Sequence, residues 1–350
     1  MDGVAPTASE MSGKRRDVAE PLTRRSVFVH PSAPIPVMGP PVGHGIRVPL
    51  GETGLNVFPL VLGGAEFGWH VDSVGSHRIL DRYVELGGNV VHTSDGFASG
   101  RSEHIIGQWI RSSGLRDDMT LMIRAGSNAD HPGLGPVSLV TSVEASLTRL
   151  GTDRIDVLYL DGSTDTSTPL EETLSTAEWL IGAGKIGHVA AASFTPERLV
   201  EARILASAGY PRITVLDAHY NLLQRSTFEG DLRLVAGAQG VAVTPSHPLE
   251  HGFLAGRKRR RERGGLSARG EQLAAYLNRR GQRVLKAVDA VAADASVPAA
   301  AVAVGWLLAQ RTVVAPIANA FTPEHVDELV QGVGLHLTRS QLGDLARAAQ

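Results

Sequence analysis

Hydrophobic residues along the chain form short runs that are separated by longer amphipathic stretches. Eight short runs are rich in apolar, β-forming residues, and most of them are continuously apolar: 58–64, 89–94, 120–126, 154–161, 187–193, 213–220, 240–246 and 312–318. Continuous apolar runs of this length are typical of parallel strands that are buried on both faces. The pattern therefore predicts eight parallel strands.

The stretches between these runs have the length and spacing of amphipathic helices. The segments at 137–151 and 171–184 both end on glycine, a favoured residue just after a helix. Further helices are expected at 73–87 and from Ser267 to Ala293. Strands that alternate with helices in this way predict an α/β fold, a closed (β/α)8 TIM barrel. An open doubly wound sheet is the alternative, but no G-x-G-x-x-G follows the first strand.

The two ends of the pattern suggest the domain organisation. Residues 1–45 are rich in Pro, Gly, Ser and charge, and such a composition cannot bury enough apolar surface to offset the entropy of ordering. We therefore expect a flexible, disordered N-terminal extension at 1–45 and a barrel at 46–350. A basic segment, "GRKRRRERGG" at 256–265, is either a phosphate or nucleic-acid patch or a solvated loop. The near-neutral charge of the chain favours the loop.

Composition narrows the classes of function. Hydrophobic residues make up 43% of the chain, the net charge is -2 and there is no cysteine. Disulfides, thiolate metal sites and a cysteine nucleophile are therefore excluded. The charge gives no argument for a nucleic-acid partner, and no apolar run approaches the ~20 residues of a membrane span. The N-terminus has no apolar secretion signal, so we expect a cytoplasmic protein without a membrane partner.

Several motifs occur together in a recognisable order. They are "PLGETGLNVFPLVLGG", "GRSEHIIGQWI", "VEASLTRLGTDRIDVLYL", "TPLEETL", "GKIGHVAAASF", "YNLLQR", "GFLAGR" and "TPEHVDELV". In wording, order and spacing the chain resembles the aldo-keto reductase superfamily from about residue 46 to the C-terminus. The resemblance implies a (β/α)8 barrel that binds NADP(H) across the C-terminal mouth and reduces carbonyl groups. In that family a tyrosine gives the proton, a lysine–aspartate pair lowers its pKa, and a histidine orients the substrate.

All four of these positions are occupied by other residues. The family's D-T-A-x-x-Y-G reads "HTSDGFA", so His92 matches the aspartate and Phe97 the tyrosine. Arg124 matches the lysine and Asp161 the histidine. A phenyl ring has no proton to donate, and general acid catalysis is typically worth about 10²–10⁴-fold. Arginine is effectively always protonated, so Arg124 cannot join a proton relay as lysine can.

Asp95 follows His92 by three residues and could be taken for the missing aspartate. A shift that brought Asp95 into that place would disturb the match to Thr93 and to the triplet at 101–103. We therefore keep the alignment without a gap.

The positions that hold the cofactor in the family are also changed. At the positions that bind the nicotinamide amide, this chain has Ala192, Ser193 and Asp217. Ser246 replaces the aromatic residue under the nicotinamide ring, and His247 replaces the serine at the pyrophosphate. At the positions that bind the phosphate and the adenine, it has Asn319, Phe321 and Leu329. Without an arginine at position 321, the charge-assisted bond to a 2′-phosphate is lost. We therefore favour no cofactor, with NADP(H) as the alternative.

The substitutions add polar residues at the predicted mouth rather than removing them. Neighbouring strands should place His92, Arg124 and Asp161 side by side, with an Arg124–Asp161 ion pair that keeps Asp161 ionised. A neutral His92 could act as a general base, and Arg124 could steady an enolate or carboxylate. Asp217 completes the candidate catalytic set, and the candidate pocket residues are Trp69, Phe97, His219 and His247.

Two other interpretations of these polar residues remain. The first is a structural role, because arginine–aspartate pairs often have one. A metal site of His92 with Asp161 or Asp217 is the weakest candidate, because no H-x-H pair or carboxylate triad supports it.

Three functions follow, all of them acting on a small molecule. We favour a cofactor-independent acid/base enzyme that catalyses an elimination, isomerisation or cyclisation. The second is a catalytically silent binding or regulatory homologue. The third is an NADP(H)-dependent oxidoreductase with an unusual proton donor, His92 or Asp161.

Overall fold

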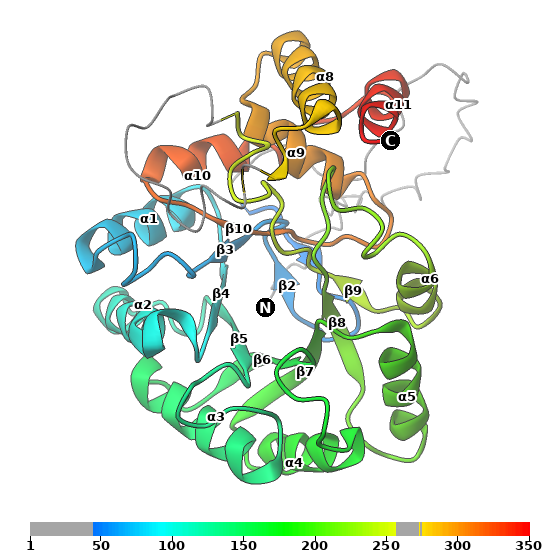
Figure 1. Ribbon diagram of the computed structural model, residues 1–350. Helices are drawn as coiled ribbons and strands as arrows, with labels where there is room; N and C mark the ends of the chain where they lie inside the picture. Colours follow the sequence, from blue (N-terminus) through cyan, green and yellow to red (C-terminus); the bar gives the residue numbers. More distant parts are fainter. Residues whose placement is uncertain (1–44, 257–272, 274) are drawn as a thin grey trace, which may run out of the picture. The chain divides into compact units, whose positions relative to one another are not determined.

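The computed structural model describes residues 45–256, 273 and 275–350. Figure 1 shows these residues as a ring of strands with helices around it. The expected N-terminal extension and the basic segment at 256–265 lie outside the described residues, apart from positions 45 and 256.

Eight parallel strands form the barrel. In spatial order they are β10 (Ile317–Asn319), β3 (Val61–Gly63), β4 (Val90–Ser94), β5 (Thr120–Ala125), β6 (Ile155–Asp161), β7 (Ile186–Ala192), β8 (Ile213–Asp217) and β9 (Ala242–Val243). The two edges meet, because Val243 N donates to Thr312 O at 3.0 Å and Ile317 N donates to Pro245 O at 2.8 Å. Each predicted apolar run overlaps one strand, so the (β/α)8 prediction is confirmed.

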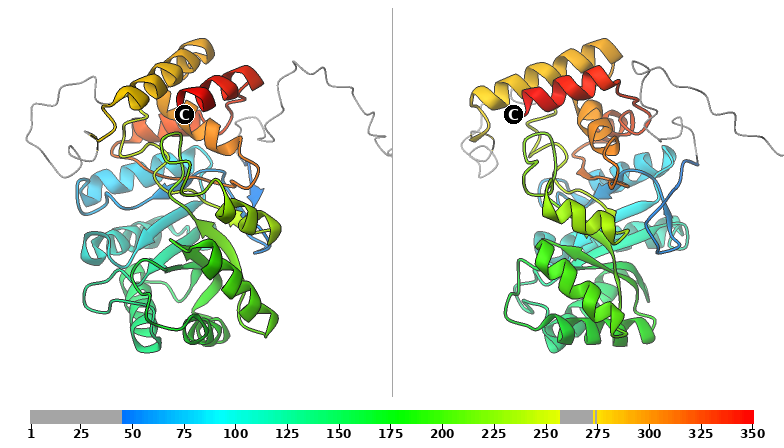
Figure 2. Two further views of the ribbon diagram at one scale, coloured as in Figure 1. Left: turned by 45° about the vertical axis from the view of Figure 1, so that its right-hand side comes forward. Right: turned by 90° about the vertical axis from the view of Figure 1, so that its right-hand side faces the viewer.

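Helices follow the strands on the outside of the barrel (Figure 2). They are α1 (Ser73–Glu85), α2 (Arg101–Ser113), α3 (Pro136–Leu150), α4 (Leu170–Gly182), α5 (Pro196–Ser207), α6 (Asp231–Ala238), α8 (Arg279–Ala295), α9 (Ala299–Leu308), α10 (Pro323–Val330) and α11 (Arg339–Ala348). A short 3₁₀ turn, η1 (Phe97–Gly100), precedes α2. Helices α1 to α6 bury apolar side chains toward the outer face of the sheet, whereas α8 packs against α9 and α11.

The helix predicted from Ser267 to Ala293 begins outside the described residues, and its C-terminal part is confirmed by α8, which covers Arg279–Ala295. Residues 267–272 and 274 lie outside the described part of the chain, and α8 begins only at Arg279. The Asn278 side chain accepts a hydrogen bond from Gly281 N at 2.9 Å and so caps the first turn. Asparagine is one of the residues favoured at this capping position.

Strand side chains alternate between the helix layer and the barrel interior. The interior cluster contains Val90, Met122, Val157 and Val215. The antiparallel hairpin β1 (Val48–Pro49) and β2 (Asn56–Val57) adds Val57 to the same cluster. With a side-chain period of two, every second residue toward the carboxyl ends of these strands also points inward. This alternation determines which polar residues reach the mouth.

No single described helix is long and apolar enough to cross a membrane. Only α8 and α9 taken together meet the length and composition test, and they are bent by 95° at the break between them.

Candidate active site at the carboxyl ends of the strands

Four strands each bring one polar side chain to the barrel mouth. His92, Arg124, Asp161 and Asp217 lie two residues along from inward-facing apolar or aromatic residues of β4, β5, β6 and β8. The register links them, because Asp161 pairs with Ala192 and Ala192 pairs with Asp217. The strand period therefore places all four on the inner face at one end of the barrel.

Arg124 lies at the centre of this group. Its Nε is 2.8 Å from Asp161 Oδ2, and its Nη1 is 3.5 Å from Asp217 Oδ2. Its Nη2 donates to Ser193 Oγ at 3.0 Å. The predicted Arg124–Asp161 ion pair is thus confirmed, and Asp217 adds a second carboxylate. Because every nitrogen of the guanidinium has a protein neighbour, Arg124 is less available to a substrate carboxylate than its sequence position suggested.

The two carboxylates differ in their ionisation. Burial acts to raise the pKa of Asp161, but the charge of Arg124 and hydrogen bonds from Arg124 and Ser163 outweigh it and hold that pKa below its usual value. Burial raises the pKa of Asp217, and the opposing effects of Arg124 and Ser246 do not cancel it. Asp161 is therefore the fixed anion of the pair, as predicted, and Asp217 is the carboxyl group that holds a proton more readily.

This difference predicts opposite effects on stability. Asp161→Asn should lower the free energy of unfolding at pH 7 by about 1–3 kcal/mol, because it removes an ionised partner of a mostly buried arginine. Asp217→Asn should raise it by about 0.5–2 kcal/mol, because a buried carboxylate that resists ionisation is removed. Urea unfolding monitored by circular dichroism measures both changes.

The pH dependence of the same variants provides a second test. The folded-state pKa of Asp161 is lowered, so its contribution is present above the unfolded pKa of about 3.9 and is lost as the pH falls through the folded value. The folded-state pKa of Asp217 is raised, so its ionisation lowers stability as the pH rises above about 3.9. Equal losses in both variants at every pH would contradict this assignment.

His92 lies deeper, among aromatic rings. It is buried, and its ring lies edge-on to Phe97 and to Tyr159, with centroids 6.2 and 5.5 Å away. Burial, and secondarily Arg124, lowers the pKa of His92 to about 3. The ring is therefore neutral at pH 7, as expected, but it is too weak a base to be the first choice for proton removal. Its Nε2 has no hydrogen-bond partner among the described residues.

The predicted pocket residues differ in their surroundings. Phe97 is half-buried beside His92, where an apolar wall was expected. Trp69 is 67% exposed, and its ring lies against His70. His219 and His247 lie together at the β8 and β9 ends, with ring centroids 4.6 Å apart. A wall role for Trp69 therefore stays a prediction, whereas the two histidines form a second polar group.

Asp95 faces away from this group and holds a loop. It is fully buried, and its Oδ2 accepts hydrogen bonds from Ser142 Oγ at 2.6 Å and Gly126 N at 2.9 Å. Its Oδ1 accepts from Ser127 N at 3.2 Å. These bonds tie the end of β4 to α3 and to the loop after β5. The alignment without a gap is therefore consistent with the structure, because Asp95 has a structural role.

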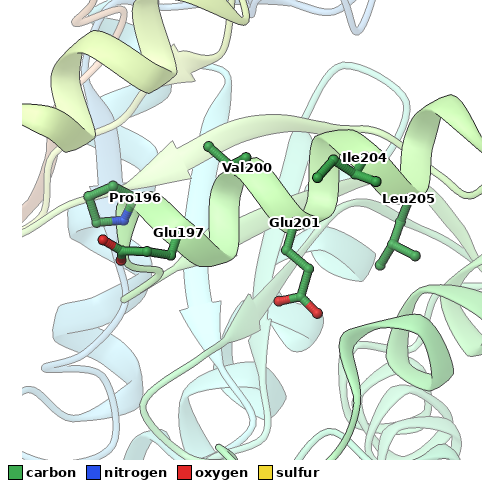
Figure 3. Close-up of a pocket in the computed structure, with 6 residues that line it drawn as sticks. All are labelled: Pro196, Glu197, Val200, Glu201, Ile204 and Leu205. Carbon is green, nitrogen blue, oxygen red and sulfur yellow. The ribbon is translucent and has the colours of Figure 1, made fainter.

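A second hollow lies outside the barrel, along α5. Figure 3 shows its lining side chains on successive turns of that helix, and its volume is about 440 Å³. They are Pro196, Glu197, Val200, Glu201, Ile204 and Leu205. No polar groups from other elements line it, so it offers no arrangement for chemistry. Nor do three or more His, Asp or Glu side chains within the described ranges form a group that could hold a metal ion.

Three residues of the mouth were missed from the sequence. Tyr159 lies inside the barrel in register with Arg124, and its hydroxyl contacts Thr244 Oγ1 at 2.8 Å. Its position two residues before Asp161 was a usable signal, because strand side chains repeat with a period of two. Ser163 donates to Asp161 Oδ1 from its backbone N at 3.0 Å and from its hydroxyl at 2.7 Å. Glu250 lies on a loop, and no periodicity pointed to it.

A family model described as the aldo/keto reductase family matches residues 59–350 of this chain. The chain belongs to the aldo/keto reductase family. Norsolorinic acid reductase of Aspergillus flavus is 25% identical over 336 residues, covering 91% of this chain and 84% of that protein. Aldo-keto reductase ausK of Emericella nidulans is 29% identical over 316 residues, covering 83% and 77%. The uncharacterized oxidoreductase YrpG of Bacillus subtilis is 29% identical over 308 residues, covering 84% and 92%.

Membership of this aldo/keto reductase family implies NADP(H), so the residues at the matching positions can be tested for fit at the nicotinamide end. Ser193 already accepts a hydrogen bond from Arg124, and Asp217 accepts one from Ser246 N at 3.0 Å. When ionised, a carboxyl group at position 217 can take hydrogen bonds from an amide NH₂ but cannot donate to its carbonyl. The polar groups at these matching positions are therefore engaged within the protein.

The residues at the matching phosphate positions fit NADP(H) no better. Phe321 N donates to His325 Nδ1 at 3.2 Å, and the Phe321 ring lies 6.4 Å from that of His70. The Asn319 side chain lies against Gly63, so closely that a Cβ there would be 2.2 Å from its Oδ1. An aromatic cluster and an amide therefore occupy the place where the resemblance expects a glycine and an arginine. The residues present do not fit NADP(H) held in that way.

Proposed function

We propose that this aldo/keto reductase relative uses its barrel mouth for acid–base chemistry on a small molecule, without hydride transfer from NADPH. In this proposal the substrate undergoes an elimination, isomerisation or cyclisation. The partner is a small molecule rather than a nucleic acid or a membrane, which the near-neutral charge of the chain supports.

One observation carries the proposal: Asp161 and Asp217 flank the same arginine, and their pKa values move in opposite directions. Pairs of ionisable groups whose surroundings separate their pKa values are the usual arrangement of acid–base sites. Asp217 then exchanges the proton with the substrate. Asp161 balances the charge of Arg124 and keeps it in position.

The neighbouring groups supply binding rather than proton transfer. The neutral His92 ring offers Nε2 as a hydrogen-bonding atom, which has no other described partner to compete for it. Phe97 supplies an apolar surface beside it. Ser193 is exposed, and through its hydrogen bond to Arg124 the charged group extends to the surface. A planar or partly apolar substrate with one polar edge would use each of these features.

A second candidate is an oxidoreductase with an altered proton donor, which the names of the relatives favour. The two donors expected from the sequence are poorly suited to it. His92 is neutral with a pKa of about 3, and Asp161 is held ionised. Asp217 would have to be the donor in this case as well. The two candidates therefore share a residue and differ in the need for a cofactor.

A titration of the full-length protein with NADPH separates the two candidates. We expect no saturable change in NADPH fluorescence with protein at micromolar concentrations, because the positions for the amide and the 2′-phosphate are otherwise engaged. The variant Phe321→Arg provides the comparison, because it returns a guanidinium to the matching position. A measurable gain of NADPH affinity in this variant would show that the assay can detect binding.

Tight, saturable binding of NADPH to the unmodified chain would overturn the cofactor-independent proposal and favour the oxidoreductase. Absence of binding together with absence of any proton-transfer activity would favour a silent binding homologue.

A further inference from the structure

A histidine–carboxylate pair at the barrel mouth is not used by the acid–base chemistry proposed above. Glu250 is 1% exposed, and its Oε2 contacts His219 Nε2 at 2.7 Å. The same carboxylate also accepts hydrogen bonds from Asn221 Nδ2 and from the Tyr276 hydroxyl. Burial acts to raise the pKa of Glu250, but the hydrogen bonds from His219, Tyr276 and Asn221 lower it to about 2. Glu250 is therefore ionised over the working range of pH.

The ionised carboxylate determines how the His219 ring is protonated. A carboxylate can only accept hydrogen bonds, so Nε2 of His219 must carry the hydrogen that lies between them. In the neutral ring the lone pair is then on Nδ1. Because the partner is held by Asn221 and Tyr276 as well, the carboxylate cannot easily turn away. The ring is consequently fixed in one tautomer and one orientation.

Exposure differs sharply across this pair. The His219 side chain is 38% exposed, whereas Glu250 is shut off from water. An accessible imidazole supported by a buried carboxylate is the arrangement by which enzymes orient a histidine and stabilise the positive charge that it develops. A pair that served only to fasten the loop would not require one partner to reach the surface.

The loop that supplies Glu250 has an unusual backbone. His247, Glu250 and His251 all have positive φ angles, of 57°, 43° and 56°. Residues other than glycine adopt this region at a cost, and such residues gather at functional sites. The loop therefore holds Glu250 in place against the preference of its own backbone.

We propose that His219, oriented by Glu250, is a nucleophilic imidazole at the barrel rim that reacts with small molecules carrying an activated acyl group. Nδ1 attacks the carbonyl carbon, an N–C bond forms, and the C–O bond breaks, so that the oxygen leaves with the bonding electron pair as a phenolate or alkoxide and takes a proton from solvent, which the water that attacks in the next step returns. Water then attacks the acyl-imidazole, the N–C bond breaks, and the carboxylic acid is released with the ring restored. The reaction needs no oxidant, reductant or cofactor.

Hydrolysis of p-nitrophenyl acetate by the full-length protein tests this proposal. We expect His219→Gln to lose about 90% of the rate above buffer, because an amide cannot act as the nucleophile. Glu250→Gln keeps the shape of the partner but removes its charge, and it should lower kcat several-fold with little change in KM. His104→Gln, which changes an exposed histidine on α2, is the matched control and should keep the full rate.

Mass spectrometry of the acid-quenched reaction gives a readout that does not depend on the variants folding. We expect the acetyl group on the peptide that contains His219 in the unmodified protein. Acetyl groups spread evenly over the exposed histidines would overturn the proposal. An unchanged rate in a folded Glu250→Gln variant would also overturn it, because the carboxylate would then only fasten the loop.

Discussion

Replacing Asp217 with asparagine should abolish at least about 99% of base-catalysed elimination at the barrel mouth. A suitable probe is 5-nitrobenzisoxazole, from which a base removes a carbon-bound proton while the N–O bond breaks and a coloured phenolate forms. A carboxylate in an apolar, partly dehydrated site is a stronger base than one in water, and general base catalysis is typically worth about 10²–10⁴-fold. Absorbance of the phenolate over time measures the rate in the two proteins.

The pH profile and a control variant make this expectation specific to Asp217. The rate should rise with pH as Asp217 loses its proton. Because burial raises the pKa of Asp217, the rise should come above the ionisation of an exposed aspartate, which is near pH 3.9. Glu201→Gln alters an exposed carboxylate on α5, away from the mouth, and should leave the rate unchanged. A flat pH profile, or equal loss in both variants, would contradict the role of Asp217.

The strand pattern was sufficient to predict most of the fold. The apolar runs located all eight strands because parallel strands in a barrel are buried on both faces and leave little room for polar residues. The same reasoning predicted the Arg124–Asp161 pair, since β5 and β6 are adjacent and both residues stand near their carboxyl ends. In this fold, strands that follow one another in the chain are neighbours in the barrel. A contact between side chains on two consecutive strands could therefore be inferred.

Contacts between strands that are not neighbours, and contacts made by loop residues, could not be inferred. Asp217 reaches Arg124 from β8, three strands away, and sequence order does not reveal such a contact. The weak basicity of His92 follows mainly from its burial, and the depth of burial cannot be read from residue order. Glu250 contacts His219 from a loop, and no sequence pattern predicts the positive φ angles of that loop. The charges at the mouth, the ionised Asp161 and the neutral His92 were therefore foreseen, but the raised pKa of Asp217 and the weak basicity of His92 were not.

Membership of the aldo/keto reductase family and the geometry of the mouth bear on different questions. The family match fixes the ancestry and the fold, and function must be argued from the site itself. The Arg124 group binds its own carboxylates and Ser193, and Phe321 N is bound to His325. Groups that are satisfied internally offer little gain to a large anionic cofactor. We therefore propose a small, weakly charged substrate for these residues.

Asp95→Ala should be the most destabilising single substitution near the mouth, with a loss of about 3–5 kcal/mol in the free energy of unfolding. The side chain is fully buried and accepts hydrogen bonds from Ser142 Oγ, Gly126 N and Ser127 N. Alanine would leave these donors without a partner in a space too small to hydrate them all. Urea unfolding gives the change, and Asp118→Ala, at an exposed turn, should cost less than about 0.5 kcal/mol.

The stability change also separates a structural Asp95 from a catalytic one. If Asp95 holds the loop after β5, Asp95→Asn should recover part of the loss, because its amide oxygen can still accept from one or two of the donors. Proteolysis should then cut Asp95→Ala first between residues 126 and 134, where the loop has lost its anchor. A variant that keeps the stability of the unmodified protein would instead mean that this buried carboxylate is maintained for chemistry, and the alignment of His92 with the family's aspartate would have to be revised.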